Sequence, residues 1–492
     1  MSIAEPSLPV DQSLPQLEVA RDPELMREVF QSHLRPLGKK IHWIRECRIS
    51  RVRYQRATRC MLQYALILED LGTGRERTQL VTGVVYAKAG RALGEWEELR
   101  RSKLGRIVLP GASSSAFAPF RWIREKLWVS GLRGREIFGA TSPAFEPFSY
   151  IPELEMLVQV FPHDHRLPGL PFLMGGLPPE LEPLLLARFG PGEWRTEAWD
   201  VELVKYLAEL RATLRLTVRA REEGSGREDE RRFYAKVYRE EEEGERTYRV
   251  LRELWEREEA RGEGFAVGRP ITYLGGPRAL IQEEVLGTSL HEVLVQQDEV
   301  APVMRRAARA LAALHLDGVK ASRRLPWREK EIAALERIGE LLRPARPHLR
   351  EEIEEIVGTV VARLEEVPTA PIHGDLHPRH IVLDGDRLVL LDLDNFAEAD
   401  PVLDVAHLLA PLAIMPLRFP IPHNRAREAA RVFAEEYFAH VPAAWRARFP
   451  LHYAAAALRV AGGVFRRQES GWPDRVEALV VEAKGSLAGK IW

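Results

Sequence analysis

The chain has 492 residues, of which 45% are apolar and 29% charged, and its formal net charge is −1. This length allows two or three hydrophobic cores, and the composition is ordinary for a globular protein. A charge so close to zero gives no overall field that would attract nucleic acid or an anionic membrane, so we expect neither as a partner. The two cysteines, Cys47 and Cys60, are too few for a disulfide framework, which fits a reducing compartment.

The first residues of the chain include several prolines and acids, without a basic start or a long apolar run. This pattern is not that of a signal peptide. We therefore expect residues 1–22 to form a flexible tail. No later stretch is apolar over the ~18 residues that a membrane span needs, and the best candidate, 449–465, contains His452 and Arg459. The protein is predicted to be cytoplasmic.

A first α+β module is predicted over residues 23–195. Alternating apolar and polar residues indicate three strands, then an amphipathic helix, then two short strands after a segment rich in Ser, Gly and Pro. The predicted elements span residues 49–53, 60–68, 80–88, 93–104, 150–153 and 156–160. Taken alone, this order fits any small α+β unit.

The same order of elements recurs over residues 196–287, and short sequence matches connect the two regions. Arg56-Ala57-Thr58 is echoed by Arg211-Ala212-Thr213, Tyr86-Ala87-Lys88 by Tyr234-Ala235-Lys236, Tyr150 by Tyr273, and Leu157-Val158-Gln159 by Leu280-Ile281-Gln282. The last two pairs share one offset. We infer that one module occurs twice, and that Lys88 and Lys236 hold equivalent positions.

Residues 288–492 are predicted to be mainly helical, because apolar residues recur there at helical spacing. The segments with this spacing are residues 303–315, 327–342, 351–364, 402–414, 426–440, 445–465 and 473–488. One polar stretch, Pro371–Val405, interrupts them and holds seven Asp, one Glu and three His.

Within this polar stretch, two apolar runs predict a β-hairpin. The runs are residues 381–383 and 388–391, with the turn at Asp384-Gly385-Asp386. Asp375 would lie on the loop that enters the hairpin, and Asp392 where its second strand ends. The two carboxylates can therefore converge on a divalent cation and on a nucleophile that must lose a proton.

At these residues the sequence resembles a known family. The motifs His373-Gly374-Asp375-Leu376-His377-Pro378, Leu391-Asp392, Asp400-Pro401 and Asp404 are similar in type and spacing to those of the aminoglycoside phosphotransferase and choline kinase group, relatives of protein kinases. The resemblance implies an α+β, protein kinase-like bilobal fold. It would comprise an antiparallel-sheet N-lobe at 196–287 and a mainly helical catalytic C-lobe at 288–492, preceded by the second N-lobe-like module.

The resemblance implies transfer of the γ-phosphate of ATP to a hydroxyl of a small molecule, such as a sugar, an aminocyclitol or an amino alcohol. It assigns catalysis to the loop of His373 and Asp375, in which Asp375 would orient and deprotonate the acceptor hydroxyl. It assigns Mg²⁺ binding to Asp392. The last loop position, usually an Asn that also binds the metal, is His380 here, and imidazole suits magnesium less well than an amide oxygen does.

In the nucleotide-binding lobe, Lys236 would neutralise the α- and β-phosphates and pair with Glu245 on the next helix. The loop over the phosphates would be residues 207–211, which lacks glycine and leaves Arg211 as a phosphate contact. The hinge whose backbone pairs with adenine would be Gln282, Glu283 and Glu284.

Two other interpretations stay open at this point. The side chains of His373, Asp375, His377 and His380 have the spacing of a transition-metal hydrolase cluster, but the later Asp motifs would then have no role. Alternatively, the chain is a non-catalytic nucleotide-binding pseudokinase with a regulatory or scaffold role. His380 and a first module without its own catalytic loop favour that alternative.

Three further expectations concern residues around the predicted centre. Asp404 should cap its helix or brace the catalytic loop, and it is not expected to be catalytic. The first module should be a cap or a regulatory module. The candidates for contacting a cationic acceptor are Glu398, Glu435 and Glu436.

Overall fold

The computed structural model describes residues 11–38, 41–55, 57–102, 143–261, 264–321, 323–467 and 471–491. The chain divides into two compact units. The first comprises residues 1–244 and 271–281, and the second comprises residues 245–270 and 282–492.

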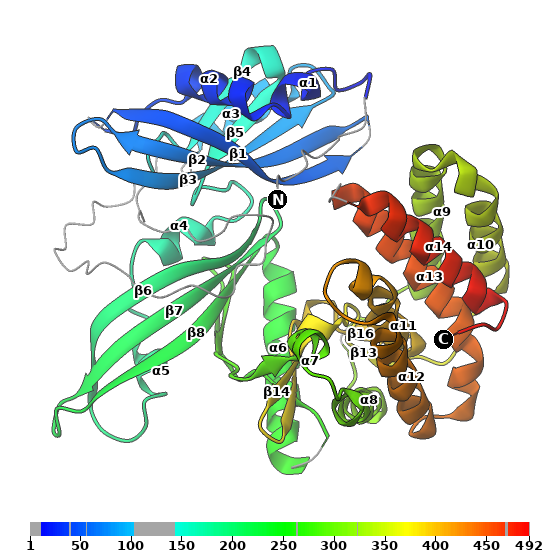
Figure 1. The fold of residues 1–492 in the computed structure, drawn as a ribbon. Helices are drawn as coiled ribbons and strands as arrows, with labels where there is room; N and C mark the ends of the chain where they lie inside the picture. Colours follow the sequence, from blue (N-terminus) through cyan, green and yellow to red (C-terminus); the bar gives the residue numbers. More distant parts are fainter. Residues whose placement is uncertain are drawn as a thin grey trace. The chain divides into compact units, whose positions relative to one another are not determined.

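The first unit begins with a five-stranded antiparallel sheet in the order β1-β2-β3-β5-β4 (Figure 1). The elements are β1 His42–Gln55, β2 Arg59–Asp70, β3 Glu76–Tyr86, α3 Arg91–Arg101, β4 Phe148–Ile151 and β5 Met156–Val160. The predicted order is therefore correct. The first strand starts earlier than predicted, because His42, Ile44 and Cys47 already place buried side chains on the core face.

Two helices, α1 Leu17–Ala20 and α2 Pro23–His33, cover one face of this sheet (Figure 1). Leu14 and Leu17 are buried in the same core as Phe30 of α2. Residues 1–10 lie outside the described residues, but residues 11–22 were expected to be part of a flexible tail and are not. Their apolar side chains cover the sheet, and the Asp11 carboxylate accepts hydrogen bonds from Tyr54 Oη and the Ala57 amide, at 2.7 and 2.8 Å.

A second five-stranded sheet has the order β6-β7-β8-β11-β10, which is the order of the first sheet. Its elements are β6 Trp194–Leu207, β7 Arg211–Glu222, β8 Glu228–Tyr238, β10 Pro270–Leu274 and β11 Ala279–Glu283. Helix α6 Glu241–Arg261 follows β8 as α3 follows β3. This agreement in topology supports the inferred duplication.

The strand registers correct the alignment of the two copies. Arg59 pairs with Gln55 and Tyr86 in the first sheet, as Arg211 pairs with Leu207 and Tyr238 in the second. In this register Val84, which pairs with Met61, is the counterpart of Lys236, which pairs with Thr213. Lys88 lies beyond the end of β3. The predicted equivalence of Lys88 and Lys236 is therefore wrong, because the short sequence matches did not follow the hairpin turns.

One apolar core joins the two sheets within the first unit. Between the sheets in sequence lie helices α4 Gly169–Met174 and α5 Glu182–Leu186, and both contribute buried leucines to that core. Leu170, Leu173 and Leu185 are fully buried, and each such side chain contributes about 1.5–3 kcal/mol. The two copies thus share one hydrophobic core and are not separate domains joined by a linker.

The second unit is mainly helical, as predicted (Figure 1). Its helices are α7 Leu290–Gln296, α8 Ala301–Leu316, α9 Trp327–Ala345, α10 Arg350–Arg363, α11 Val402–Leu409, α12 His423–Ala439, α13 Ala443–Arg467 and α14 Trp472–Leu487. The segment predicted as one helix over 402–414 changes at Ala410 to the 3₁₀ helix Ala410–Leu417, which contains Pro411 and Pro416. Among the described helices, none has the length and apolarity to cross a bilayer.

Short strands hold the polar stretch in place in this unit. Strands β14 Ile381–Asp384 and β15 Arg387–Leu390 form the predicted hairpin, flanked by β12 Thr288–Ser289 and β9 Ala266–Val267. Strand β13 Ala370–Ile372 pairs with β16 Ala397–Ala399 just before and just after the polar residues.

Candidate active site

The hairpin β14–β15 positions the two key aspartates. Ile381 and Leu390 are a buried cross-strand pair at its open end. Asp375 lies on the loop before β14, and Asp392 follows β15 in a left-handed conformation with φ 64°. Asp375 and Asp392 are therefore attached to the two chain segments that meet at the open end of one buried hairpin.

Gly374 and Asp404 fix the loop that carries Asp375. Gly374 has φ 80°, and a Cβ there would lie 2.4 Å from the Asn395 carbonyl oxygen, so only glycine fits. The buried Asp404 carboxylate accepts hydrogen bonds from the amides of His373 and Gly374, at 2.6 and 2.9 Å. The expected bracing role of Asp404 is confirmed, and it does not cap its helix.

Asp404 is itself held by a buried pair from two other helices. His315 Nε2 lies 3.1 Å from Asp404 Oδ2, and His315 Nδ1 lies 2.6 Å from Tyr437 Oη. Burial raises the pKa of Asp404, but the hydrogen bond and charge of His315 outweigh it and leave that pKa below its usual value. The brace is therefore an ionised carboxylate at neutral pH.

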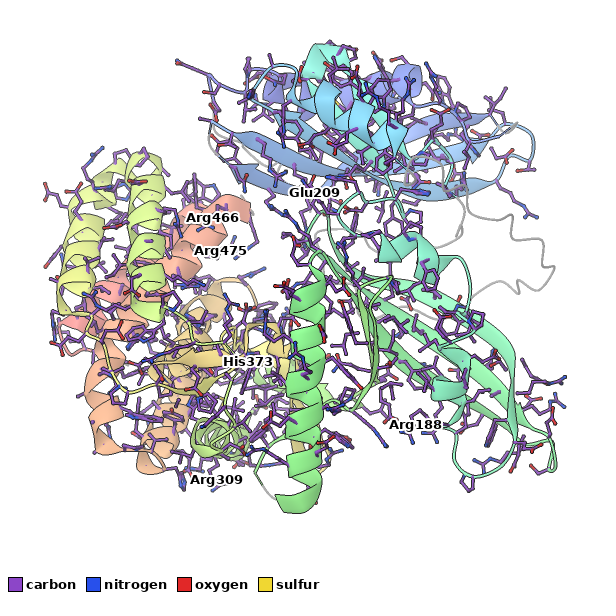
Figure 2. All side chains as sticks on the ribbon, turned by 180° about the vertical axis from the view of Figure 1, so that it is seen from behind. Arg188, Glu209, Arg309, His373, Arg466 and Arg475 are labelled. Carbon is purple, nitrogen blue, oxygen red and sulfur yellow. The ribbon has the colours of Figure 1, made fainter. Side chains whose placement is uncertain are left out.

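His373 lies inside the second unit, where Figure 2 labels it, and its side chain is completely buried. Its Nε2 is 2.8 Å from the Leu391 carbonyl oxygen, so Nε2 carries a proton that it donates. Nδ1 is then free to accept the Asp375 amide at 3.4 Å. Burial lowers the pKa of His373. The neutral ring thus ties the loop of Asp375 to the end of β15.

His380 connects the two aspartates. Its Nδ1 is 2.9 Å from the Asp375 carbonyl oxygen, which can only accept, so Nδ1 donates. Its Nε2 lies 3.3 Å from Asp392 Oδ2. With Nδ1 carrying the proton, the Nε2 lone pair and the Asp392 carboxylate are both groups that can bind a metal ion. The residues present therefore fit one metal through an oxygen and a nitrogen ligand.

The hydrolase alternative is not supported by the contacts of its proposed ligands. His373 uses Nε2 on the Leu391 carbonyl, and His377 Nδ1 accepts the Arg379 amide at 3.3 Å. Over the described residues, no group of three or more His, Cys, Asp or Glu is arranged to hold a metal ion.

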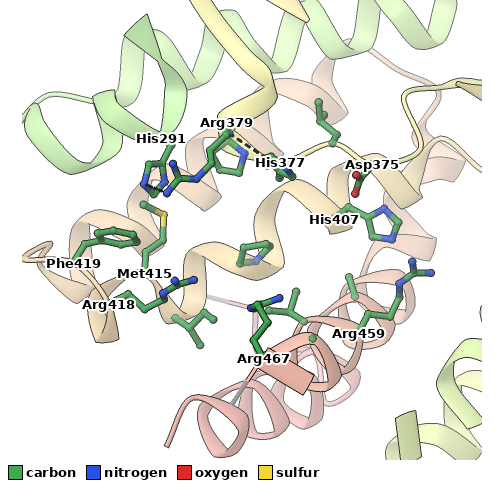
Figure 3. Close-up of a pocket in the computed structure, with 17 residues that line it drawn as sticks. His291, Asp375, His377, Arg379, His407, Met415, Arg418, Phe419, Arg459 and Arg467 are labelled. Atoms are coloured by element: carbon green, nitrogen blue, oxygen red, sulfur yellow. Dashed lines mark hydrogen bonds between the residues drawn. The ribbon is translucent and has the colours of Figure 1, made fainter. Parts of the chain in front are cut away.

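A cavity of about 470 Å³ opens beside the half-buried Asp375 (Figure 3). Its walls come from α7, the loop of residues 375–379, His407 of α11, the segment 411–419 and helix α13. Sequence reasoning found Asp375 and the neighbouring motif residues Leu376, His377 and Pro378, but missed the rest of this lining. No sequence signal marks those residues, because they come from segments far apart in the chain.

The predicted nucleotide-binding residues lie in both units. In the first unit, Lys236 is half-buried on β8, with Nζ 5.7 Å from the centre of the Tyr238 ring, and Arg211 begins β7. In the second unit, Glu245 of α6 lies 3.9 Å from Arg249, and its side chain is 53% exposed. Gln282 and Glu283 end β11 and Glu284 follows, with the Glu283 amide donating to the Arg269 carbonyl at 3.0 Å.

Residues 217–451 match the profile of the phosphotransferase enzyme family. The resemblance to the aminoglycoside phosphotransferase and choline kinase group, predicted from the motifs around Asp375, is therefore confirmed over this part of the chain. No curated protein matches the sequence.

Several solved structures of small-molecule kinases are similar to this chain. One is the amicoumacin kinase hAmiN in complex with AMP-PNP and Ca²⁺, with 14% identity, a TM-score of 0.40, and coverage of 57% of this chain and 87% of that chain. Another is a choline kinase from Cryptosporidium parvum, with 9% identity, a TM-score of 0.39, and coverage of 59% and 89%. A third is the GDP and kanamycin complex of APH(2")-IIia, with 13% identity, a TM-score of 0.39, and coverage of 63% and 99%.

Proposed function

We propose that the protein transfers the γ-phosphate of ATP to a hydroxyl of a small molecule. The observation that carries this proposal is the geometry around the hairpin β14–β15. Asp375 lines a cavity, and His380 contacts both the Asp375 carbonyl oxygen and the Asp392 carboxylate, which we propose as the second ligand of a cation site. Phosphoryl transfer needs little covalent help from a protein beyond positioning and charge stabilisation, and this arrangement offers both.

Asp375 is the proposed general base. Its backbone is held on both sides, because its amide donates to His373 Nδ1 and its carbonyl accepts from His380 Nδ1. In the transfer step, the acceptor hydroxyl oxygen attacks the γ-phosphorus and its proton passes to the Asp375 carboxylate. The bond from the γ-phosphorus to the bridging oxygen breaks, and ADP leaves. His373 acts through Asp375 and is a positioning residue.

Asp392 and His380 are the proposed ligands of Mg²⁺. When bound, the metal offsets the charge of the phosphate oxygens. The imidazole of His380 replaces the usual amide, and an imidazole nitrogen suits Mg²⁺ less well than an amide oxygen does. We therefore expect the protein to accept Mn²⁺ at least as well as Mg²⁺.

The nucleotide contacts are proposed from the resemblance. Lys236 would hold the α- and β-phosphates, Glu245 would pair with it, and Arg211 would add a phosphate contact. The hinge for adenine would be the backbone of Gln282, Glu283 and Glu284.

A transfer assay tests the proposal. Full-length protein with ATP and either Mg²⁺ or Mn²⁺ is supplied with neutral, cationic and anionic hydroxyl compounds, and the phosphorylated product is measured by ³¹P NMR and mass spectrometry. The controls are Asp375→Asn and Asp386→Asn, the latter an exposed carboxylate in the hairpin turn. Transfer that Asp375→Asn removes and Asp386→Asn retains supports the proposal. Nucleotide binding without transfer or ATP hydrolysis under any condition would instead favour the pseudokinase alternative.

A further inference from the structure

The charge of the cavity beside Asp375 is unusual for a site that would take a cationic acceptor. Four arginines line it, Arg379, Arg418, Arg459 and Arg467, whereas among its described lining residues Asp375 is the single carboxylate (Figure 3). A positively charged ligand would meet one acid, which is the proposed base itself, and four like charges.

The arginines converge from separate parts of the second unit. Arg379 belongs to the catalytic loop, Arg418 follows the 3₁₀ helix Ala410–Leu417, and the other two lie on α13. In Figure 3 the loop with Asp375 and Arg379 lies along one side of the cavity, and Arg418 and Arg467 lie along the other. The positive charge is thus a property of the cavity and not of one exposed helix face.

Two histidines lie beside these arginines in the cavity. Arg379 Nη2 lies 2.9 Å from His291 Nε2, and because a guanidinium only donates, His291 accepts as a neutral ring. Burial, with Arg379 and Arg418 nearby, lowers the pKa of His291 to about 4. Burial also lowers the pKa of His407, with Arg459 adding to the effect. These histidines therefore add no charge at neutral pH. Arg459 forms an ion pair with Glu331 at 2.5 Å.

The acids expected to hold a cationic acceptor lie elsewhere. Glu398 accepts from Thr369 Oγ1 at 3.3 Å, Glu435 pairs with Arg431 at 2.8 Å, and Glu436 pairs with Arg309 at 3.2 Å. None of the three lines the cavity. The expectation that they contact a cationic amino alcohol or aminocyclitol therefore has no support in the structure.

We propose that the acceptor is a hydroxyl compound that also carries an anionic group, a carboxylate or a phosphate. This inference rests on the proposed phosphotransferase function and deepens it. The hydroxyl would lie at Asp375 and the anion between Arg379 and Arg418, whose planar guanidinium groups bind carboxylate or phosphate in bidentate fashion. Ile414, Met415 and Val460 provide an apolar wall for the carbon skeleton. The volume of about 470 Å³ is suited to a small molecule.

Matched acceptors test the sign of the charge. Glucose, glucuronate, glucose 6-phosphate and glucosamine share a ring and differ in charge, and choline and glycerate extend the comparison to acyclic compounds. We expect kcat/KM to rank the anionic member above the neutral one and the cationic member last. The kcat/KM values for glucuronate and glucose 6-phosphate, compared with each other and with that for glycerate, separate recognition of a carboxylate from recognition of a phosphate.

Arginine variants test the site. Arg418→Gln and Arg379→Gln should each lower kcat/KM for the preferred anionic acceptor by about 10- to 100-fold, the value of one charge-assisted hydrogen bond. The KM for ATP should stay constant. Arg418→Lys should retain the preference for anions, and Arg418→Glu should shift it toward glucosamine, which a merely unfolded variant cannot do. Arg431→Gln, on α12 outside the cavity, is the matched control.

The two proposals fail separately. Transfer to neutral or cationic acceptors with kcat/KM above that of the anionic counterparts would leave the phosphotransferase function intact and overturn the charge inference. If no acceptor is phosphorylated, the proposed function fails, and calorimetry of glucuronate against glucose still decides the inference. Equal affinity for the two sugars, or anion binding that survives Arg418→Glu, would overturn it.

Discussion

The two copies of the five-stranded module share one topology, but they differ in which face of the sheet is buried in the core between them. Both sheets follow the same strand order, and both turn between their first two strands at a left-handed residue that is not glycine, Ala57 with φ 52° and Glu209 with φ 61°. At the position of Lys236, however, the first copy has Val84. The backbone is thus repeated while the side chain proposed for the phosphates is not.

The packing explains this difference. Val84 is fully buried in the core that joins the sheets, whereas the second sheet contributes to that core its opposite face, with Ala235 and Val237. Lys236, between these two residues, points away from the shared core. The face that would meet a nucleotide in the first copy is therefore filled by protein. Topology follows from alternating apolar residues, but function depends on which face is left open.

If only the second copy serves a catalytic centre, removing the carboxylate of Asp375 should lower turnover more than any other single change considered. Asp375→Asn should lower phosphoryl transfer by about 10²–10⁴, the usual contribution of a general base, and leave ATP affinity nearly unchanged. Steady-state kinetics and calorimetry with ATP measure the two effects. Transfer at the unmodified rate would mean that catalysis takes place at another centre. The second copy could then no longer be singled out as the one that serves catalysis.

The proposed metal site also distinguishes the two copies, because the hairpin that leads to Asp392 follows the second copy and not the first. Asp392→Ala removes the oxygen ligand and leaves His380, so the gain in ATP affinity on adding Mg²⁺ or Mn²⁺ should disappear. Titrations with each metal and with EDTA test this expectation, and Asp386→Asn serves as the control. A metal effect of full size in Asp392→Ala would place the ion elsewhere.

The lysines test the comparison directly. Lys236→Ala should raise the KM for ATP and lower kcat, with a combined loss in kcat/KM of about 10- to 100-fold for one charge-assisted phosphate contact. Lys88→Ala should change neither, because Lys88 lies beyond β3 and is not the counterpart of Lys236. Loss of activity in Lys88→Ala with full activity in Lys236→Ala would show that the first copy serves the catalytic loop.

Much of the fold, and the placement of the residues proposed for the site, could be predicted because their signals are local. The hairpin β14–β15 has an alternating pattern and an Asp-Gly turn, and Asp375, His380 and Asp392 sit at fixed distances from it in sequence. Apolar residues at helical spacing likewise predicted the helices of the second unit.

What was missed depends on contacts between distant segments. The apolar residues Leu14 and Leu17 look like part of a polar, Pro-rich tail until the sheet that they cover is known. Short sequence identities aligned Lys88 with Lys236. That alignment was wrong because the strand register is set by the hairpin turns. The arginines of the cavity come from positions as far apart as 379 and 467, and no local pattern brings them together.

The smallest effect should come from the contact between the copies. Arg59 Nη1 lies 2.8 Å from Glu209 Oε2, at the β6–β7 turn that Figure 2 labels, and the Glu209 amide donates to the buried Asp164 carboxylate at 2.7 Å. That turn is the proposed phosphate-covering loop. The first copy therefore contacts this loop of the second copy through two charged residues, Arg59 and Asp164.

Arg59→Ala leaves the buried Glu209 carboxylate without its cation, a loss of about 1–3 kcal/mol in the free energy of unfolding. Because Asp164 still holds the backbone of the turn, the rise in the KM for ATP should stay below about tenfold, which corresponds to 1.4 kcal/mol. Glu209→Gln removes the stranded charge, so the double variant should recover part of the stability lost in Arg59→Ala. Chemical denaturation and ATP kinetics of the two single variants and the double variant measure this coupling. Strictly additive losses would show that the ion pair does not couple the two copies.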